Sequence, residues 1–153
     1  NNHDAVTITG IQPTDSVKYS YNGENLDSVP VIVDAGEYAV TVTIKRINYE
    51  DYVKKVTARI VPTAIDGLTI QPKEGLVYSG SEQELIVGVN GVQTGDKIEY
   101  SKDNENWSEK KPTGVNAGEY TVHTRVTRNK NYTITYLPDV KVTIDKKNIS
   151  IKF

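Results

Sequence analysis

One seven-residue phrase occurs twice in this chain, as DAGEYAV at residues 34–40 and as NAGEYTV at residues 116–122. In both places a turn signal is followed directly by a segment in which apolar and polar residues alternate. Such alternation is typical of a β-strand with one buried face. The phrase therefore predicts that the protein consists of two copies of one β-domain.

The similarity between the copies extends along most of the chain. Gly10 matches Gly91 and Val56 matches Val140, so the spacing between matched residues grows by three along the copy. Each added residue falls in a polar or turn-like stretch, because an insertion within a half-buried strand would reverse the face of every following side chain. Further matched pairs are Gln12 and Gln93, Asp15 and Asp96, Tyr19 and Tyr100, Arg46 and Arg128, Asn48 and Asn131, Tyr49 and Tyr132, and Ile65 and Ile149.

The frame of the repeat predicts the domain boundaries. We expect one domain at residues 1–63, a second at 64–148, and the start of a further repeat or an extra strand at 149–153. Residues 65–81 have no counterpart before Asn1, so the first domain is expected to lack its opening strand and to leave a sheet edge unpaired. Residues 149–153 are a strand of the missing type, which predicts strand exchange onto that edge in a neighbouring molecule; the alternative is a dangling tail. The frame and the absence of Met predict a segment of a longer mature protein.

Period-two alternation predicts the fold class. Residues 38–44 and 120–126 alternate cleanly, and Leu85, Val87 and Val89 are expected to form another inward-facing set. No 3.6-residue apolar stripe is present. Each copy is predicted to form six or seven short strands in two antiparallel sheets packed face to face. The expected fold is all-β, with two tandem antiparallel β-sandwich domains.

Composition excludes several functions. The chain has 153 residues and a formal net charge of −2, and its 18 Lys and Arg residues are spread among 20 Asp and Glu residues. This balance argues against nucleic acid as a partner, since phosphate binding needs a clustered basic face. No apolar run is long enough to span a membrane, so no membrane insertion is expected. The absence of Cys excludes disulfides in this chain and favours a bacterial over a eukaryotic secreted β-domain, although a Cys-free intracellular protein stays open.

The repeated phrase resembles the Asp-x-Gly/Ala-x-Tyr-x-Cys phrase of immunoglobulin-like (Ig-like) domains, with Val40 at the position of the Cys. In those domains the Tyr forms a corner, in which its hydroxyl bonds to the backbone upstream while its ring fills the core. The resemblance implies this structural role for Tyr38 with Gly36, and for Tyr120 with Gly118.

A wider set of motifs resembles the bacterial Ig-like tandem repeats, of the mostly-β, glycine-rich kind, in large cell-surface proteins of Gram-positive bacteria. The motifs are Tyr78-Ser79-Gly80, Val17–Ser20 and Ile98–Ser101, the loop at 103–107, the repeated phrase, Asn48-Tyr49 and Asn131-Tyr132, and Val142–Lys147. The resemblance implies two tandem Ig-like β-sandwiches displayed outside the cell or on the cell wall. It implies a role as stalk, spacer or adhesin module, and no catalytic residues.

The residues themselves do not predict an enzyme, and no cofactor is expected. A Ser-His-Asp triad needs a His held between nucleophile and carboxylate. His3 lies at the start of the chain, and His123 is expected on the outward, solvent-facing side of a strand. Residues 50–51 are acidic but lie in a loop, and Glu37 and Glu119 belong to the structural phrase, so neither pair predicts acid–base catalysis.

The loop at residues 103–106, Asp-Asn-Glu-Asn, offers oxygen atoms to a cation. It lacks the spacing and the Gly of an EF-hand loop. A polar hairpin loop is the alternative to a calcium site, and the sequence leaves the choice open.

Aromatic residues that the copies do not share are the candidate ligand-binding residues. Tyr and Trp serve both as core residues and as platforms for sugars or proteins. Trp107 lies beside a polar loop where the first copy has Leu26, and Tyr21, Tyr52 and Tyr136 are also unshared. The alternative for Trp107 is packing over the edge of the sandwich.

These observations predict a non-catalytic structural or adhesion module of a bacterial cell-surface or secreted protein. The junction at residues 61–64 has no Gly/Ser run, which indicates a stiff connection between neighbouring repeats. Its ligand, if it has one, would be a glycan or a host surface protein. The alternative is a carbohydrate-binding accessory module of an extracellular polysaccharide-degrading protein, which should present coplanar, exposed Tyr and Trp rings.

Overall fold

The computed structural model describes residues 2–153, and it is all-β, as the sequence predicts. Its sheets are mostly antiparallel, an arrangement consistent with a β-sandwich. No helix among the described residues is long and apolar enough to cross a membrane. The chain divides into two compact units, Asn1–Pro62 (unit 1) and Thr63–Phe153 (unit 2), each of which has its own sheets.

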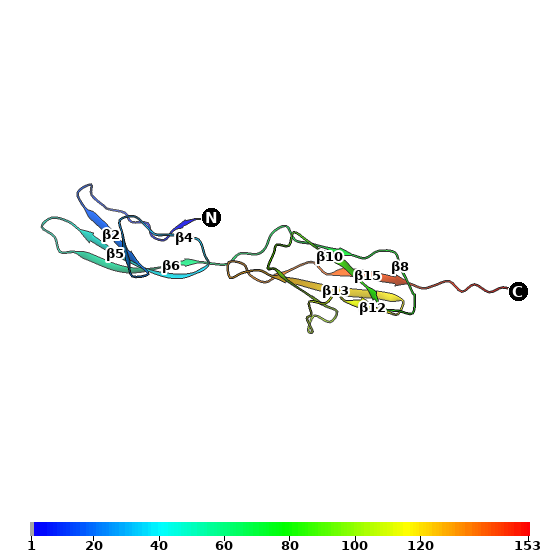
Figure 1. The fold of residues 1–153 in the computed structure, drawn as a ribbon. Coiled ribbons are helices and arrows are strands. Elements are labelled where there is room, and N and C mark those ends of the chain that lie inside the picture. The colour runs from blue at the N-terminus through cyan, green and yellow to red at the C-terminus, as the bar shows by residue number, and fades with distance from the viewer. Residues whose placement is uncertain (1) are drawn as a thin grey trace. The chain divides into compact units, whose positions relative to one another are not determined.

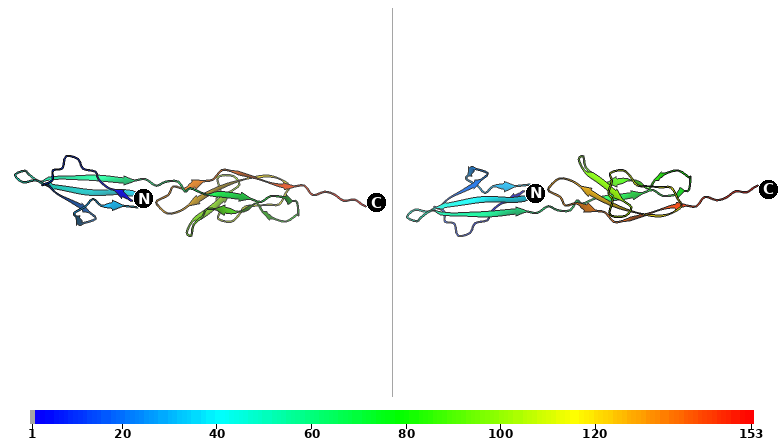
Figure 2. Two further views of the ribbon diagram at one scale, coloured as in Figure 1. Left: turned by 90° about the horizontal axis from the view of Figure 1, so that it is seen from above. Right: turned by 90° about the horizontal axis from the view of Figure 1, so that it is seen from below.

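The strands of unit 1 are β1 (His3–Asp4), β2 (Ser16–Tyr21), β3 (Glu24–Leu26), β4 (Val31–Ile32), β5 (Gly36–Lys45) and β6 (Tyr52–Ile60). Four of them form an antiparallel sheet in the order β3-β2-β5-β6. Figure 1 labels β2, β5 and β6 of this sheet. The long β5–β6 hairpin, cyan to turquoise in Figure 2, is the main element of this sheet. A separate antiparallel ribbon joins β1 to β4.

Unit 1 has a small core. Its buried members are Tyr19 from β2 and Val40 and Val42 from β5, which face the same side of the sheet. Val6 and Ile8 pack against them from a segment that forms no strand. The alternation that begins in the repeated phrase thus correctly predicts that Val40 and Val42 lie in the core.

The strands of unit 2 are β7 (Thr69–Pro72), β8 (Leu76–Val77), β9 (Gln83–Glu84), β10 (Ile86–Asn90), β11 (Lys97–Ser101), β12 (Thr113–Gly114), β13 (Gly118–Thr127), β14 (Thr135–Tyr136) and β15 (Val140–Asp145). The largest sheet has the order β11-β13-β15-β8, and β14 also pairs with β13. Strand β8 runs parallel to β15, whereas the other pairs are antiparallel. Two short ribbons join β7 to β10 and β9 to β12.

The core of unit 2 is larger than that of unit 1. Side chains from β10, β11, β13 and β15 form it, together with side chains from the segment before β7. Val122, the match of Val40, is fully buried. The buried apolar residues of this core are Ile65, Leu85, Ile86, Val89, Tyr100, Val122, Val126, Leu137, Val142 and Ile144.

The start of β10 departs from the expected alternation. Leu85 and Val89 are buried, but Ile86 is also buried and Val87 is 50% exposed. The pairing of β10 with β7 shifts register between Ile86 and Gly88. A bulge of this kind adds a residue to one strand and re-aims the side chains that follow it. The prediction that Val87 faces inward is therefore wrong.

The described part of unit 1 has no counterpart of β7 and β8. In unit 2, β8 pairs with the end of β15 at Ile144 and Asp145. The matching residues of unit 1 are Ile60 and Val61, at the end of β6, where β6 is the edge of its sheet. Unit 1 therefore has an uncovered sheet edge where unit 2 has a strand.

The chain enters unit 2 only a few residues after it leaves β6. Strand β6 ends at Ile60, and Thr63 is already bound within unit 2. The N–H of Thr63 donates to the carbonyl of Asn131 at 3.1 Å, and its own carbonyl accepts the N–H of Thr133 at 2.8 Å. Residues 61–62 lie between the last strand residue and this first contact.

The two separate cores predict two unfolding transitions, with unit 1 unfolding at the lower temperature because it buries fewer apolar side chains. Val40→Ala and Val122→Ala remove the same two methyl groups from matched, fully buried positions. We expect each to destabilise its own unit by roughly 2 kcal/mol and to leave the other transition in place. Calorimetry with hydrogen exchange read for each unit checks this, and a single transition shifted equally by both variants would contradict it.

Candidate functional site

An ion pair with a buried carboxylate recurs at the same place in both units. Asp15 immediately precedes β2 and Arg46 immediately follows β5, so the paired ends of these strands bring the two side chains together. Arg46 Nε and Nη2 donate to the two carboxylate oxygens of Asp15, each at 2.7 Å. In unit 2, Arg128 donates to Asp96 in the same way, at 2.7 and 2.8 Å. We call each bidentate pair the Asp–Arg clamp.

The clamp also closes a turn. Gln12 donates its N–H to Asp15 Oδ2 at 2.8 Å, and Asp15 donates its N–H to the carbonyl of Gln12 at 3.0 Å. Gln93 and Asp96 repeat both bonds, at 2.8 and 3.1 Å. Solvent does not reach the Asp15 carboxylate. Hydrogen bonds from Arg46 first, and then from the Gln12 backbone, lower the pKa of Asp15 to about 2.

An aromatic ring completes each clamp. The Arg46 guanidinium lies 5.6 Å from the centroid of the Tyr49 ring, and the Arg128 guanidinium lies 5.2 Å from that of Tyr132. Contacts of this kind add a modest attraction to the ion pair. The sequence identifies all these residues as shared between the copies but assigns them no joint role. The signal was available, since each copy places Asp directly before and Arg directly after two strands that pair.

The repeated phrase forms a corner at the start of β5 and of β13. Tyr38 donates its hydroxyl to the carbonyl of Asp34 at 2.8 Å, and Tyr120 donates to the carbonyl of Asn116 at 2.8 Å. Because the acceptor is a backbone oxygen, the change from Asp to Asn leaves the bond intact. Gly36 and Gly118 have φ angles of 154° and 151°, which residues with a side chain rarely adopt.

Two of the four candidate ligand-binding residues lie together on the outer face of unit 2. The Trp107 and Tyr136 rings meet edge to face, with centroids 5.9 Å apart and planes at 75°. The Arg125 guanidinium lies 4.4 Å from the centroid of the Trp107 ring. Arg125 is directly opposite Tyr136 in the β13–β14 pairing. We call Trp107, Arg125 and Tyr136 the outer cluster.

A charged pair lies under the outer cluster. Arg125 donates from Nε to Glu99 Oε2 at 2.9 Å, and Lys97 donates from Nζ to Glu99 Oε1 at 2.9 Å. These hydrogen bonds, from Lys97 first and Arg125 next, lower the pKa of Glu99 although burial opposes them. Trp107 is half-buried over this pair, whereas Tyr136 is 60% exposed. The Trp107 ring thus covers a structural ion pair on the sheet.

The other two candidates lie in unit 1 and belong to different surroundings. Tyr21 is half-buried, packs against the core, and meets the Tyr38 ring edge to face at 6.1 Å. Tyr52 is 56% exposed and lines a hollow near the Asp–Arg clamp. The structure therefore brings Trp107 and Tyr136 together and places Tyr21 against the core of unit 1.

His123 lies on the outer face of β13, as expected, and is half-buried there. Its Nδ1 lies 2.7 Å from Asp139 Oδ1, and its side chain is 20% exposed. Ser101 lies directly opposite His123 across the β11–β13 pair, but its hydroxyl donates to Asp103 Oδ1 at 2.8 Å. A nucleophilic Ser needs the imidazole as the acceptor of its proton. These contacts give the Ser101 hydroxyl a structural role in the loop.

The loop at residues 103–106 is held by its own hydrogen bonds. Asp103 Oδ1 accepts the backbone N–H groups of Glu105 and Asn106 at 2.9 and 2.8 Å, and Oδ2 accepts from the Asn106 side chain at 2.6 Å. These bonds, with the Asn106 side chain first, hold the pKa of Asp103 well below its usual range. Such bonding is typical of a turn closed by Asp. Within residues 2–153 there is no group of three or more His, Asp or Glu residues suited to a metal ion.

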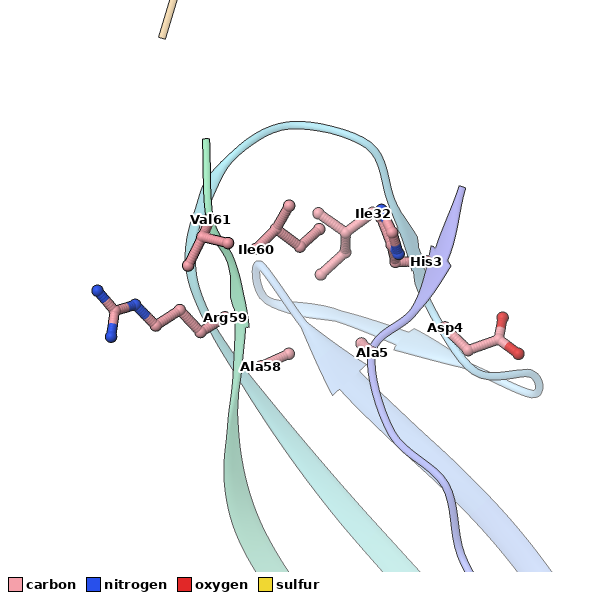
Figure 3. Close-up of a pocket in the computed structure, with 8 residues that line it drawn as sticks. All are labelled: His3, Asp4, Ala5, Ile32, Ala58, Arg59, Ile60 and Val61. Carbon is pink, nitrogen blue, oxygen red and sulfur yellow. The ribbon is translucent and has the colours of Figure 1, made fainter. Parts of the chain in front are cut away.

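Two hollows lie among the described residues of unit 1, one toward each end of β6. The first is a cavity of about 370 Å³, in which Ile32 and Ile60 point toward each other while Asp4 and Arg59 point away (Figure 3). It lies at the uncovered end of β6. The second, of about 230 Å³, lies beside the Asp–Arg clamp and is lined by Ile11, Tyr52 and their neighbours.

Neither the protein-family models nor the curated proteins searched gave a match to this chain. Side-chain contacts are therefore the evidence that distinguishes residues that stabilise the fold from candidate ligand-binding residues. The clamps and corners, which both units share, bind parts of their own unit to each other. The outer cluster of unit 2 and the hollows described for unit 1 are among the places where the units differ.

The clamp predicts a loss of unit 1 stability in acid. The pKa of Asp15 in the folded protein lies below its ordinary value of 3.8, so its ionisation stabilises the fold above that pH. This contribution is lost as the pH falls from 3.8 toward about 2. We expect the Asp15 carboxyl carbon to titrate near 2 by NMR, and Arg46→Gln to raise that midpoint. A wild-type midpoint near 3.8 would show that the ion pair does not form in solution.

The outer cluster predicts that Trp107 stabilises unit 2. Because the ring covers the Arg125–Glu99 pair, Trp107→Ala should lower the free energy of unfolding of unit 2 by about 1–3 kcal/mol. Tyr136→Ala, which removes the more exposed partner, should cost less. Denaturant unfolding checks both variants. Unchanged stability in Trp107→Ala would show that the ring does not stabilise the ion pair beneath it.

Proposed function

We propose that this chain is a non-catalytic structural module, two Ig-like β-domains in tandem, from a bacterial cell-surface or secreted protein. It acts as a stalk or spacer repeat that holds other parts of its parent protein at a distance from the cell wall. The proposal rests on what the shared residues do, on the connection between the units, and on the resemblance to tandem surface repeats described above.

The observation that carries the proposal is the Asp–Arg clamp in both units. Each clamp joins the residue before one central strand to the residue after its neighbour, and the Tyr corner ties down the other end of the same long strand. Residues repeated for binding would be expected at an exposed surface. Here the repeated residues contact other residues of their own unit. This is expected of a repeat whose shared residues maintain its fold.

The connection between the units supports a spacer. Thr63 is bound to unit 2 by two backbone hydrogen bonds, so the free linker is residues 61–62 and includes Pro62. Pro has a fixed φ angle and restricts the residue before it. A linker of this length and composition favours a narrow range of arrangements over a flexible tether.

A carbohydrate-binding module is less well supported. Sugar rings stack on flat aromatic platforms, whereas the Trp107 and Tyr136 rings cross at 75°. Arg125 already occupies one face of Trp107. The outer cluster therefore resembles packing over a sheet more than an open platform.

Stiffness can be measured by placing spin labels on the two units. The chain has no Cys, so Lys54→Cys on β6 and Thr143→Cys on β15 give two unique, exposed labelling sites. We expect pulsed electron paramagnetic resonance to show a narrow distribution of distances between the two labels. Inserting ten Gly and Ser residues between Val61 and Pro62 adds a coil of roughly 17 Å root-mean-square length and should broaden the distribution clearly.

The matched control places the same insertion in the exposed Asn22-Gly23 turn of unit 1, which leaves the linker intact and should keep the narrow distribution. The spacer proposal is wrong if the unmodified chain already shows a distribution as broad as that of the linker insertion.

A further inference from the structure

A hollow of about 230 Å³ lies in unit 2, between the end of β11 and the segment that leads to β12. Three lysines line it: Lys102 directly after β11, and Lys110 and Lys111 before β12. The hydroxyl residues Ser108 and Thr113 line it as well, and none of the described lining residues is acidic. We call this site the lysine hollow.

Two of the three lysines are held in place by the backbone. Lys102 donates from Nζ to the carbonyl of Thr113 at 3.0 Å, and Lys111 donates from Nζ to the carbonyl of Val87 at 2.7 Å. A Lys ammonium group has three N–H donors, so each of these groups keeps donors for a further acceptor. Because a carbonyl is neutral, these bonds position the two positive charges without neutralising them.

Lys110 adds a third charge with no partner in the fold. Its side chain is exposed, and no carboxylate in the described part of the chain pairs with any of the three lysines. The backbone N–H of Lys110 donates to Ser108 Oγ at 3.1 Å, which leaves the Ser108 hydroxyl able to donate its own proton. The lysine hollow therefore offers an anion both ammonium and hydroxyl donors.

Asp103 limits the charge that the lysine hollow can accept. Its carboxylate receives hydrogen bonds from the side chains of Ser101 and Asn106, two residues that line the hollow. This negative charge offsets part of the positive charge of the lysines. The hollow therefore suits an anion with a single charge better than one with several.

Unit 1 shows that the fold does not require cations here. Lys102 takes the place of Tyr21, and Lys111 takes the place of Val29. Tyr21 and Val29 are half-buried and pack against the core of unit 1. Unit 2 thus has two lysines where the same framework accommodates packed apolar side chains, and the third, Lys110, bonds to nothing in the fold through its side chain.

We propose that the lysine hollow binds an acidic sugar, one uronate residue of an anionic polysaccharide. The ammonium groups of the three lysines face the sugar carboxylate, and the hydroxyls of Ser108 and Thr113 bond to the ring hydroxyls. Charge and hydrogen bonds hold the sugar, so the site needs no flat aromatic platform. This binding goes beyond the spacer role, which requires no ligand.

The lining and the size of the hollow favour a sugar over other carboxylates. Asn106, Ser108 and Thr113 accompany the lysines, and their amide and hydroxyl groups match a ring that carries several hydroxyls beside its carboxylate. An acidic peptide instead presents its carboxylate on an apolar stem. The volume lies below the roughly 300–1,000 Å³ of pockets for drug-sized ligands, so the hollow accommodates one sugar residue and not a longer segment.

Titration of the isotope-labelled full chain with a short oligogalacturonate tests the ligand. We expect NMR shifts at Ser108, Lys110 and Thr113, with a Kd on the order of 1 mM at low ionic strength. Added salt should weaken the binding because the charges are near the surface. The methyl ester of the same oligomer keeps the hydroxyls but has no charge, so it should bind roughly tenfold more weakly or less.

Variants of the lysines test the site. Lys110→Gln removes one charge from an exposed side chain, so unit 2 should stay folded and the affinity should fall roughly tenfold. Lys54→Gln removes the same charge from the exposed surface of unit 1 and is the matched control, with the affinity unchanged. Lys102→Tyr combined with Lys111→Val installs the residues of unit 1 and should abolish the shifts.

Four outcomes overturn the proposal. The first is an absence of shifts at the lysine hollow with oligogalacturonate. The second is equal binding of the methyl ester, which would show that the charge is not recognised. The third is an affinity that Lys110→Gln leaves unchanged. The fourth is tighter binding of inorganic phosphate or of a glutamate peptide, which would assign the hollow to another anion. None of these outcomes alters the linker measurement, so a failure here leaves the spacer proposal standing.

Discussion

Each unit depends on a carboxylate that has been withdrawn from water and held by one guanidinium. An unpaired buried carboxylate is strongly destabilising, so the Asp15 and Asp96 charges require their Arg partners in bidentate contact. Meeting that requirement fixes the end of β2 against β5, and of β11 against β13. The register of those pairs then determines which side chains face the core. The alternation along the central strands therefore depends on a contact just outside them.

The two units share a framework of paired strands but differ in the residues that cover it. Unit 2 covers the outer face of β13 with Trp107 over the Arg125–Glu99 pair, and it closes both ends of its core with chain that precedes β9. Unit 1 has Thr43 at the position of Arg125 and exposes apolar residues at both ends. The copies thus differ in the segments and side chains that cover their sheets and cores. The strand pairs that carry the clamp and the corner are the same in both.

Sequence patterns predict the parts of this structure that depend on local periodicity. Val40 and Val122 are identified as core residues because a half-buried strand repeats every two residues. Val87 is missed, since a bulge adds a residue without leaving a mark on the apolar pattern. The meeting of Trp107 with Tyr136 depends on the pairing of β14 with β13 and on a loop that folds over the sheet. The clamp was visible as a recurrence of Asp and Arg, but their contact required the strand register.

The parallel pairing of β8 with β15 has a mechanical consequence. One of these strands leads back to the start of unit 2 and the other leads to its end, and they run in the same direction. A pull on the two ends of the unit therefore slides the strands past each other, and their hydrogen bonds, including the one from Tyr78 to Asp145, bear the load at the same time. In the described part of unit 1, no parallel strand pairs with the end of β6, so this way of sharing a load belongs to unit 2.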